Sequence, residues 1–300
     1  MTITGIGETV LDIVFRDGQP QAAVPGGSTF NAMISLGRTL KNTLRMVTQT
    51  GDDYVSGLVL DFMSANGVST DYVRRAKGQT TVSMAMLDKA NNAHYEFFRD
   101  KDLPAFVAPK MDFEPGDLVL FGSFFAINPE TREQARAIVR KAHSCGALVY
   151  YDINFRKNHN AADSLPQIEE NIALSDIVRG SSEDIEALYG TSDAAAVYRD
   201  RIAPLCPNFI CTKGARETEV FSPGVRLSFP VPQDTPVVST IGAGDNFNAG
   251  VLYALATGSN YSPADARSAI DWERIVPIAH KFSANVVASL YNYVDPDFEP

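Results

Sequence analysis

Three small residues and an acid, Gly242-Ala243-Gly244-Asp245, stand directly before the strongly helical stretch NFNAGVLYALA. If a helix begins just after Ile241, the first N–H groups of this turn have no acceptor inside the helix. Small side chains let an anion approach those N–H groups, and the helix dipole adds partial positive charge there. We therefore interpret the turn as a candidate anion hole.

The same dipole favours the ionised form of Asp245, which could then accept a proton from a bound hydroxyl. A base beside an anion hole suits phosphoryl transfer to an alcohol, because positioning and charge stabilisation supply most of that catalysis. An isolated GxGD would better fit a tight turn in which Asp245 only caps the helix. The short motif alone does not decide between these interpretations.

Two familiar nucleotide-binding motifs do not fit. The pattern GxxxxGK[ST] is absent, and a dinucleotide fingerprint would need glycine or alanine where Val10 and Phe247 stand. The net charge is −10, and no cluster of Lys and Arg could follow a phosphate backbone. We therefore expect no nucleic acid partner.

From about residue 117 onward, apolar strand-like runs alternate with helical stretches, which is the pattern of a parallel sheet covered by helices. The runs GDLVLFGSFF, ALVYYDINFR, SDIVRGS and NFICTKG each end in a turn. Ligands bind at the carboxyl ends of the strands in such sheets. The residues expected on that rim are Asp152, Asn154, Arg156, Ser181, Thr212, Lys213 and Gly214.

Two earlier segments, residues 10–24 and 80–100, are predicted to be hairpins that form a small separate sheet able to cover a cleft. Between them, GGSTFNAMISLGRTL predicts a helix capped by Ser28 or Thr29.

With 300 residues, of which 45% are hydrophobic, the chain can form one large α/β domain or two smaller ones. The N-terminal MTITGIGETVLDIVF predicts a strand and not a secretory signal, and the apolar run Leu118 to Ile127 is too short to span a bilayer. We expect a soluble, cytoplasmic protein with no membrane partner.

The turn in its full setting, T-I-G-A-G-D-N-F, resembles the C-terminal signature of the ribokinase-like, or phosphofructokinase-B type, carbohydrate kinases. Other motifs follow in that family's order along nearly the whole chain. The resemblance implies an α/β fold, a three-layer α/β/α sandwich with a mostly parallel central sheet and a small β-sheet lid. It also implies a single kinase domain over residues 1–300, with the lid formed by segments of about 12–25 and 71–103.

The resemblance also assigns substrate-binding and catalytic positions. Asp12 and Asn31 match sugar-binding residues, and an Asp can accept two hydroxyl hydrogen bonds. Arg156, at the end of D-x-N-x-R, would face the transferred phosphoryl group, which suits a planar guanidinium. The remaining matches are Gly26 and Gly27 against the sugar, Asp245 as base and sugar ligand, and Gly242, Ala243 and Gly244 as the anion hole.

For the nucleotide, the resemblance implies ATP and Mg²⁺. Thr212, Lys213 and Gly214 match a T-x-G that contacts the nucleotide, and Asn285 lies on the helix that lines the adenine pocket in relatives. Relatives carry N-x-x-E where this chain has Ser181 and Asp184. Asp184, or Glu183 in its place, would act on the metal indirectly.

One further departure concerns a monovalent cation. Relatives usually carry an Asp where Ser239 stands, and this Asp helps form a cation site in some members. Activation by potassium is therefore not predicted.

The resemblance implies ATP-dependent phosphorylation of a primary hydroxyl of a sugar. Fructose ranks first, because GETVLDI and FFRDKDLPA resemble fructokinase-like members; ribose, ketodeoxygluconate, other sugars, a nucleoside or a vitamin are alternatives. Ser239 and Ser181 motivate another hypothesis, a sugar- or nucleotide-binding protein that has lost efficient catalysis. By analogy, the lid would pair two subunits in a homodimer.

Overall fold

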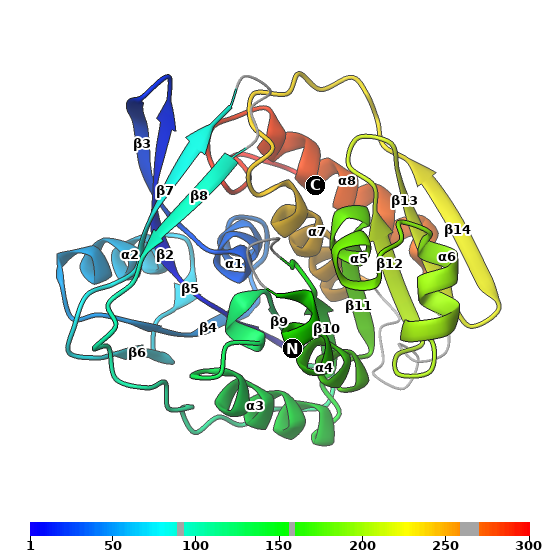
Figure 1. Cartoon of the computed structure of the whole chain (residues 1–300), viewed down its shortest axis with the longest axis horizontal. Coiled ribbons are helices and arrows are strands. Elements are labelled where there is room, and N and C mark those ends of the chain that lie inside the picture. Colours follow the sequence, from blue (N-terminus) through cyan, green and yellow to red (C-terminus); the bar gives the residue numbers. More distant parts are fainter. Residues whose placement is uncertain (89–92, 156–159, 259–269) are drawn as a thin grey trace.

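The computed structural model describes residues 1–88, 93–155, 160–258 and 270–300. Most of its strands form one large sheet in the order β14-β13-β12-β11-β10-β9-β1-β4-β5, with β6 paired to β4 (Figure 1). The pairs from β12 to β5 are parallel, whereas β13 and β14 add an antiparallel edge. The strands are β1 (Thr2–Ile6), β4 (Thr43–Thr50), β5 (Val68–Ser69), β6 (Val73–Arg75), β9 (Leu118–Gly122), β10 (Leu148–Asp152), β11 (Ile177–Ser181), β12 (Asn208–Thr212), β13 (Glu217–Ser222) and β14 (Val225–Pro230).

Helices cover both faces of this sheet. Residues of β9 alternate between two hydrophobic clusters, with Leu118 and Leu120 in one and Val119 and Phe121 in the other. The first cluster includes α1 (Ser28–Thr39), α2 (Tyr54–Ala65), α7 (Ala243–Thr257) and α8 (Trp272–Val287); the second includes α3 (Arg132–Ser144), α4 (Ala161–Ala173), α5 (Ser182–Tyr189) and α6 (Ala194–Val197). Burial on both faces explains the nearly continuous apolar runs of the parallel strands. The predicted three-layer α/β/α sandwich is confirmed.

Two short helical turns complete the main body. A 3₁₀ turn, η1 (Phe124–Ala126), follows β9, and the π-helical turn η2 (Tyr198–Ile202) continues α6. Within the part of the chain that the structure describes, no helix combines the length and the apolar character needed to cross a membrane.

A second sheet of four strands has the order β3-β2-β7-β8 and confirms the predicted lid sheet (Figure 1). Its strands are β2 (Val10–Arg16), β3 (Gln19–Gly26), β7 (Val82–Leu87) and β8 (Ala93–Phe98). The strand Val73–Arg75, inside the segment 71–103, pairs with β4 of the large sheet. The apolar face of the lid sheet packs Val14 and Ala85 against Ile241, the residue before the Gly242 turn. The lid therefore contacts the chain where the candidate anion hole begins.

The start of α1 differs from the prediction. Its N-cap is Gly27, and no side chain makes the capping hydrogen bond, so the expected cap by Ser28 or Thr29 is wrong. Gly27 has a φ of 122°, and a Cβ at this position would collide with the carbonyl oxygen of Glu8. The backbone therefore turns sharply at the glycine, which places Ser28 already inside the helix.

Candidate active site

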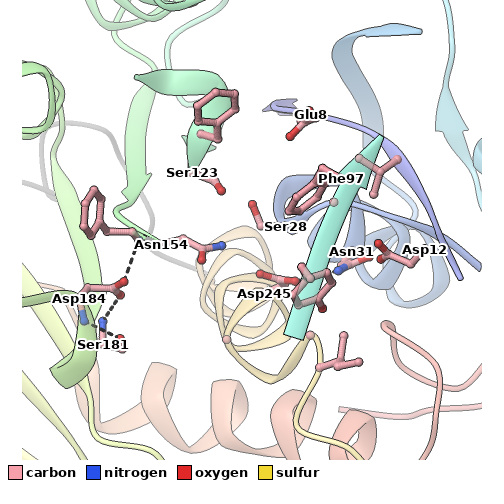
Figure 2. Close-up of a pocket in the computed structure, with 18 of the residues that line it drawn as sticks. Glu8, Asp12, Ser28, Asn31, Phe97, Ser123, Asn154, Ser181, Asp184 and Asp245 are labelled. Carbon is pink, nitrogen blue, oxygen red and sulfur yellow. Dashed lines mark hydrogen bonds between the residues drawn. The ribbon is translucent and has the colours of Figure 1, made fainter. Parts of the chain in front are cut away.

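A cavity of about 650 Å³ lies where the lid sheet faces the carboxyl ends of the large sheet's strands. Strand β8 of the lid contributes Tyr95 and Phe97, and Arg99, the residue after β8, also lines the cavity. Figure 2 shows Asp245 between two groups of side chains, with Asp12 and Asn31 on one side and Ser181 and Asp184 on the other. Of the residues predicted from the sequence, the cavity wall includes Asp12, Gly27, Asn31, Asn154, Ser181, Glu183, Asp184, Gly242, Gly244 and Asp245.

The candidate anion hole is the first turn of α7. The helix begins at Ala243, with Gly242 as its N-cap at a φ of 76°. A Cβ on Gly242 would lie 2.8 Å from the carbonyl oxygen of Asn292, so both the dihedral angle and the contact require glycine. The N–H of Ala243 donates a long hydrogen bond to the carbonyl oxygen of Thr240 at 3.4 Å. The first N–H groups of a helix otherwise have no acceptor one turn earlier and can be donated to an anion.

Asp245 lies in that first turn and contacts a predicted sugar-binding residue. The Nδ2 of Asn31 donates a hydrogen bond to Oδ2 of Asp245 at 2.8 Å. Asn31 is only 3% exposed, and its Oδ1 is buried without a hydrogen-bond partner among the described residues. A buried acceptor in this position is costly unless a ligand satisfies it, and a sugar hydroxyl would do so.

Asp12 is positioned by two other donors. The hydroxyl of Ser83 on β7 donates to Oδ1, and the Nδ2 of Asn292 donates to Oδ2 at 3.1 Å. The carbonyl oxygen of Asn292 also accepts a hydrogen bond from Nδ2 of Asn246 at 2.8 Å. Asn292 thus connects Asp12, a predicted sugar-binding residue, to α7, the helix that carries the predicted base Asp245. Sequence reasoning missed Asn292, and no motif in the C-terminal segment indicated it.

Arg179 is the second residue that sequence reasoning missed. Its Nη1 donates to Oδ1 of Asp152 at 3.1 Å and its Nη2 donates to Oγ1 of Thr212 at 2.6 Å. The same guanidinium lies against Gly244, where an added Cβ would be 2.9 Å from Nη2. A buried arginine in the otherwise apolar strand IVRGS, on the same face as Ser181, was the available signal.

A hydrogen-bond chain fixes the orientation of this arginine. Oδ2 of Asp152 accepts from Nδ2 of Asn248 at 2.9 Å, and the hydroxyl of Tyr150 donates to Oδ1 of Asn248 at 2.9 Å. Burial acts to lower the pKa of Arg179, but the carboxylates of Asp152 and Asp184 outweigh it and raise the pKa above its usual value. Arg179 is therefore a fixed positive charge beside the first turn of α7.

Both carboxylate oxygens of Asp184 accept hydrogen bonds from backbone N–H groups. Its Oδ1 accepts from the N–H of Phe155 at 2.7 Å, and its Oδ2 accepts from the N–H of Ser181 at 2.6 Å in a capping box that starts α5. Burial raises the pKa of the Asp184 carboxyl, although the charge of Arg179 opposes that effect. The neighbouring Glu183 is exposed and lines the cavity.

The described residues contain no cluster of three or more His, Cys, Asp or Glu that could hold a metal ion. Mg²⁺ in phosphoryl-transfer sites is usually held by one or two carboxylates, waters and the substrate phosphates. Glu183, an exposed carboxylate on the cavity wall, fits that requirement.

The predicted nucleotide residues lie partly apart from this cavity. Thr212, Lys213, Gly214 and Asn285 are not among its described lining residues. Lys213 pairs through Nζ with Oε1 of Glu217 at 2.9 Å. The Nδ2 of Asn285 donates to Oδ2 of Asp295 at 3.2 Å.

Arg156 lies outside the described residues. Two non-glycine residues of the cavity wall have positive φ angles. Asn154, two positions before Arg156, has a φ of 35°, and Ser123, which follows β9, has a φ of 54°. Both residues line the cavity, and such left-handed backbone at non-glycine residues concentrates at functional sites.

The fold and the site together define a ribokinase-like α/β kinase. The family model described as "pfkB family carbohydrate kinase" matches residues 6–290, and the chain belongs to this family of ATP-binding carbohydrate kinases.

Relatives with established names share much of the chain. A fructokinase of Rhizobium leguminosarum bv. trifolii is 29% identical over 262 residues, which cover 83% of this chain and 78% of the relative. The aminoimidazole riboside kinase of Salmonella typhimurium is 25% identical over 273 residues, which cover 88% and 84%. The structure of the aminoimidazole riboside kinase from Salmonella enterica, solved with aminoimidazole riboside and an ATP analogue, has a TM-score of 0.83 at 21% identity and covers 99% of this chain and 97% of its own.

Proposed function

We propose that this carbohydrate kinase transfers the γ-phosphoryl group of ATP to a primary hydroxyl of a sugar, with Asp245 as the base. The observation that carries the proposal is the hydrogen bond from Asn31 to Asp245. It joins a predicted sugar-binding residue to the predicted base, which lies in the first turn of α7 beside the candidate anion hole. A sugar held by Asn31 and Asp12 would present a hydroxyl to the base and to the phosphoryl group.

In the proposed step, the sugar hydroxyl gives its proton to the Asp245 carboxylate. The hydroxyl oxygen forms a bond to the γ-phosphorus while the bond from that phosphorus to the bridging oxygen breaks, and ADP leaves. The N–H groups of Gly242, Ala243 and Gly244 and the guanidinium of Arg179 stabilise the charge on the transferred group. Arg156 is proposed as a further cation for the same group.

Mg²⁺, when bound, would be held mainly by the phosphates with Glu183 and Asp184 acting indirectly, and it would neutralise phosphate charge. Ser181 completes the proposed phosphate contacts. Ser239 accepts a hydrogen bond from the N–H of Ile241 at 3.2 Å, and the proposal includes no monovalent cation.

The remaining contacts are proposed from the sequence motifs. Gly26 and Gly27 would lie against the sugar ring. Thr212, Lys213, Gly214 and Asn285 would contact the nucleotide.

Fructose is the proposed substrate. The motifs GETVLDI and FFRDKDLPA support it, as does the relative named as a fructokinase. The relative named as an aminoimidazole riboside kinase supports the nucleoside alternative instead. Ketodeoxygluconate and ribose keep the same mechanism with a different acceptor.

ADP release measured across fructose, ribose, ketodeoxygluconate, adenosine and pyridoxal tests the proposal. Turnover with a sugar is expected, and Asp245→Asn should reduce it by about a hundredfold or more while sugar binding persists. Undiminished turnover in the variant would refute the role of Asp245. Binding of a sugar without any turnover in the wild type would favour a binding protein that has lost catalysis.

We also propose a homodimer formed through the lid sheet. Met86 on β7 and Phe98 on β8 are 38% and 52% exposed, and a second subunit would cover such apolar surface. A monomeric mass in solution would contradict this proposal.

A further inference from the structure

An acidic and a basic side chain, Glu8 and Arg99, form an ion pair on the cavity wall. Glu8 lies between β1 and β2, and Arg99 directly follows β8 of the lid. Nε of Arg99 donates to Oε1 of Glu8 at 3.2 Å, and Nη2 donates to Oε1 and Oε2, each at 3.1 Å. Both residues line the cavity. The main body and the lid are thus joined by a forked ion pair inside the candidate site.

Two aromatic rings hold the guanidinium of Arg99 in place. The centroid of the Phe97 ring lies 4.5 Å from Cζ of Arg99, and the centroid of the Phe124 ring lies 5.0 Å from it. Stacking of this kind suits the flat guanidinium and restricts its rotation. The bonds to Glu8 and the two rings together restrict the orientation of the Arg99 guanidinium, although 38% of the side chain is exposed.

Acidic side chains outnumber basic ones among the described residues of the cavity wall. Asp12 and Asp245 line the cavity together with Glu8. Among the described residues of the wall, the other cationic side chain is Arg179, which pairs with Asp152 and lies against Gly244. On the described part of the wall, a carboxylate on a bound sugar would meet mainly acidic side chains, and both Arg99 and Arg179 are already paired with acids.

We infer that the site takes neutral polyhydroxy sugars and discriminates against sugar acids, and that Glu8 sets this preference by pairing with Arg99. The inference rests on the proposed kinase function and names the substrate class of the same site. The hydrogen bonds from Arg99 to Glu8 use Nε and Nη2, so Nη1 can donate to a neutral hydroxyl of the sugar. A sugar acid would have to compete with Glu8 for the same guanidinium.

Removal of the Glu8 charge tests the inference. The ratio of kcat/KM for D-fructose to that for 2-keto-3-deoxy-D-gluconate should exceed about ten in the wild type. Glu8→Gln keeps the shape of the side chain and should move this ratio toward the acid by about tenfold or more, because Arg99 is then unpaired. The double variant Glu8→Gln with Arg99→Met should cancel that shift, since the cation is gone.

Glu130→Gln is the matched control, because Glu130 is exposed and lies outside the cavity wall. Thermal melting of each variant reports whether the fold is intact. A wild type that prefers the sugar acid, or a ratio in Glu8→Gln within about twofold of the wild type, would overturn the inference.

Calorimetric binding of the same two sugars separates this inference from the kinase proposal. If no sugar is phosphorylated, the proposed function fails, yet tighter binding of fructose than of the acid still supports the role of Glu8. Equal binding of both sugars, or no binding of fructose, would overturn that role.

Discussion

The side-chain amide of Asn31 donates a hydrogen bond to the Asp245 carboxylate at 2.8 Å, although the two residues are 214 positions apart in the sequence. Asn31 lies in α1 and Asp245 in the first turn of α7. The bond makes the orientation of the proposed base dependent on a residue of the proposed sugar site. Changes at Asn31 should therefore affect chemistry as well as sugar binding.

Asn31→Asp should shift the pH profile of turnover. A second carboxylate beside Asp245 raises the pKa of one of the two, because both cannot easily be ionised at this separation. The base would then be protonated up to a higher pH, so the rising acid limb of kcat should move to higher pH. Asn31→Ala removes the donor without adding charge. It should lower kcat/KM about tenfold and move the acid limb less, because loss of one hydrogen bond raises the pKa of the carboxyl less than a second negative charge does.

Steady-state kinetics between pH 5 and 9 would measure this effect. Asn42→Asp adds the same charge at a partly exposed position outside the cavity wall and serves as the control. An acid limb that stays in place in Asn31→Asp would contradict the proposed coupling.

Arg179→Lys should raise the KM for ATP, lower kcat, or do both, by about tenfold or more in kcat/KM. Lysine keeps the positive charge but cannot reach Asp152 and Thr212 together in a forked arrangement. The KM for the sugar should change little, since Arg179 lies against Gly244 of the proposed anion hole. ADP-release kinetics with each substrate varied in turn would separate these effects.

Arg136→Lys provides a control for that experiment. Arg136 is also buried, and it pairs with Glu170 at 2.8 Å outside the cavity wall. Similar losses of activity in the two variants would mean that Arg179 acts through stability alone.

The two glycines of the anion hole should respond differently to alanine. Gly242→Ala is strained at a φ of 76° and brings Cβ to 2.8 Å from the backbone of Asn292, so it should lower the melting temperature and the activity together. Gly244→Ala brings Cβ to 2.9 Å from the guanidinium of Arg179 and not from backbone. It should displace the guanidinium and reduce turnover while the melting temperature changes much less.

Thermal melting and ADP release on both variants would test this contrast. Gly57→Ala is a suitable control, because a Cβ there meets no atom within 4 Å. Equal losses of stability in Gly242→Ala and Gly244→Ala would contradict the assignment.

The sequence predicted the layered fold well because its signals are local. Apolar runs such as LVLFG and the turn Arg16-Asp17-Gly18 determine strands and hairpins through burial and backbone geometry, which neighbouring residues largely define. The start of α1 was predicted wrongly, because the contact between Gly27 and Glu8 that fixes it is tertiary. Local propensity alone favoured a side-chain cap.

The candidate site was predicted only in part for the same reason. The G-A-G-D turn and the strand-end residues carry motifs, whereas Arg179 and Asn292 act through partners far away in the chain. An arginine within an apolar strand and an asparagine near the C-terminus have no spacing pattern that indicates a role. Their positions become informative only when the sheet brings Asp152, Thr212 and Asp12 beside them.

His280 should make the stability of the fold depend on pH below about 7. It lies in α8, is 7% exposed, and its Nε2 is 2.9 Å from Oγ1 of Thr218. Burial lowers the pKa of His280 from its ordinary value of 6.5. As the pH falls through 6.5, the unfolded chain therefore binds a proton before the folded protein does, and the free energy of unfolding decreases. The loss continues until the pH reaches the lower pKa of the folded state.

His280→Gln should remove this part of the pH dependence, because glutamine can still bond Thr218 but cannot be protonated. The melting temperature of the wild type, measured from pH 7.5 to 5, should fall more steeply than that of the variant. His94→Gln is the control, since the His94 side chain is 73% exposed, and its melting curve should follow the wild type. Carboxyl groups that titrate in the same range are common to all three proteins and cancel in the comparison. Parallel curves for the wild type and His280→Gln would show that His280 does not contribute.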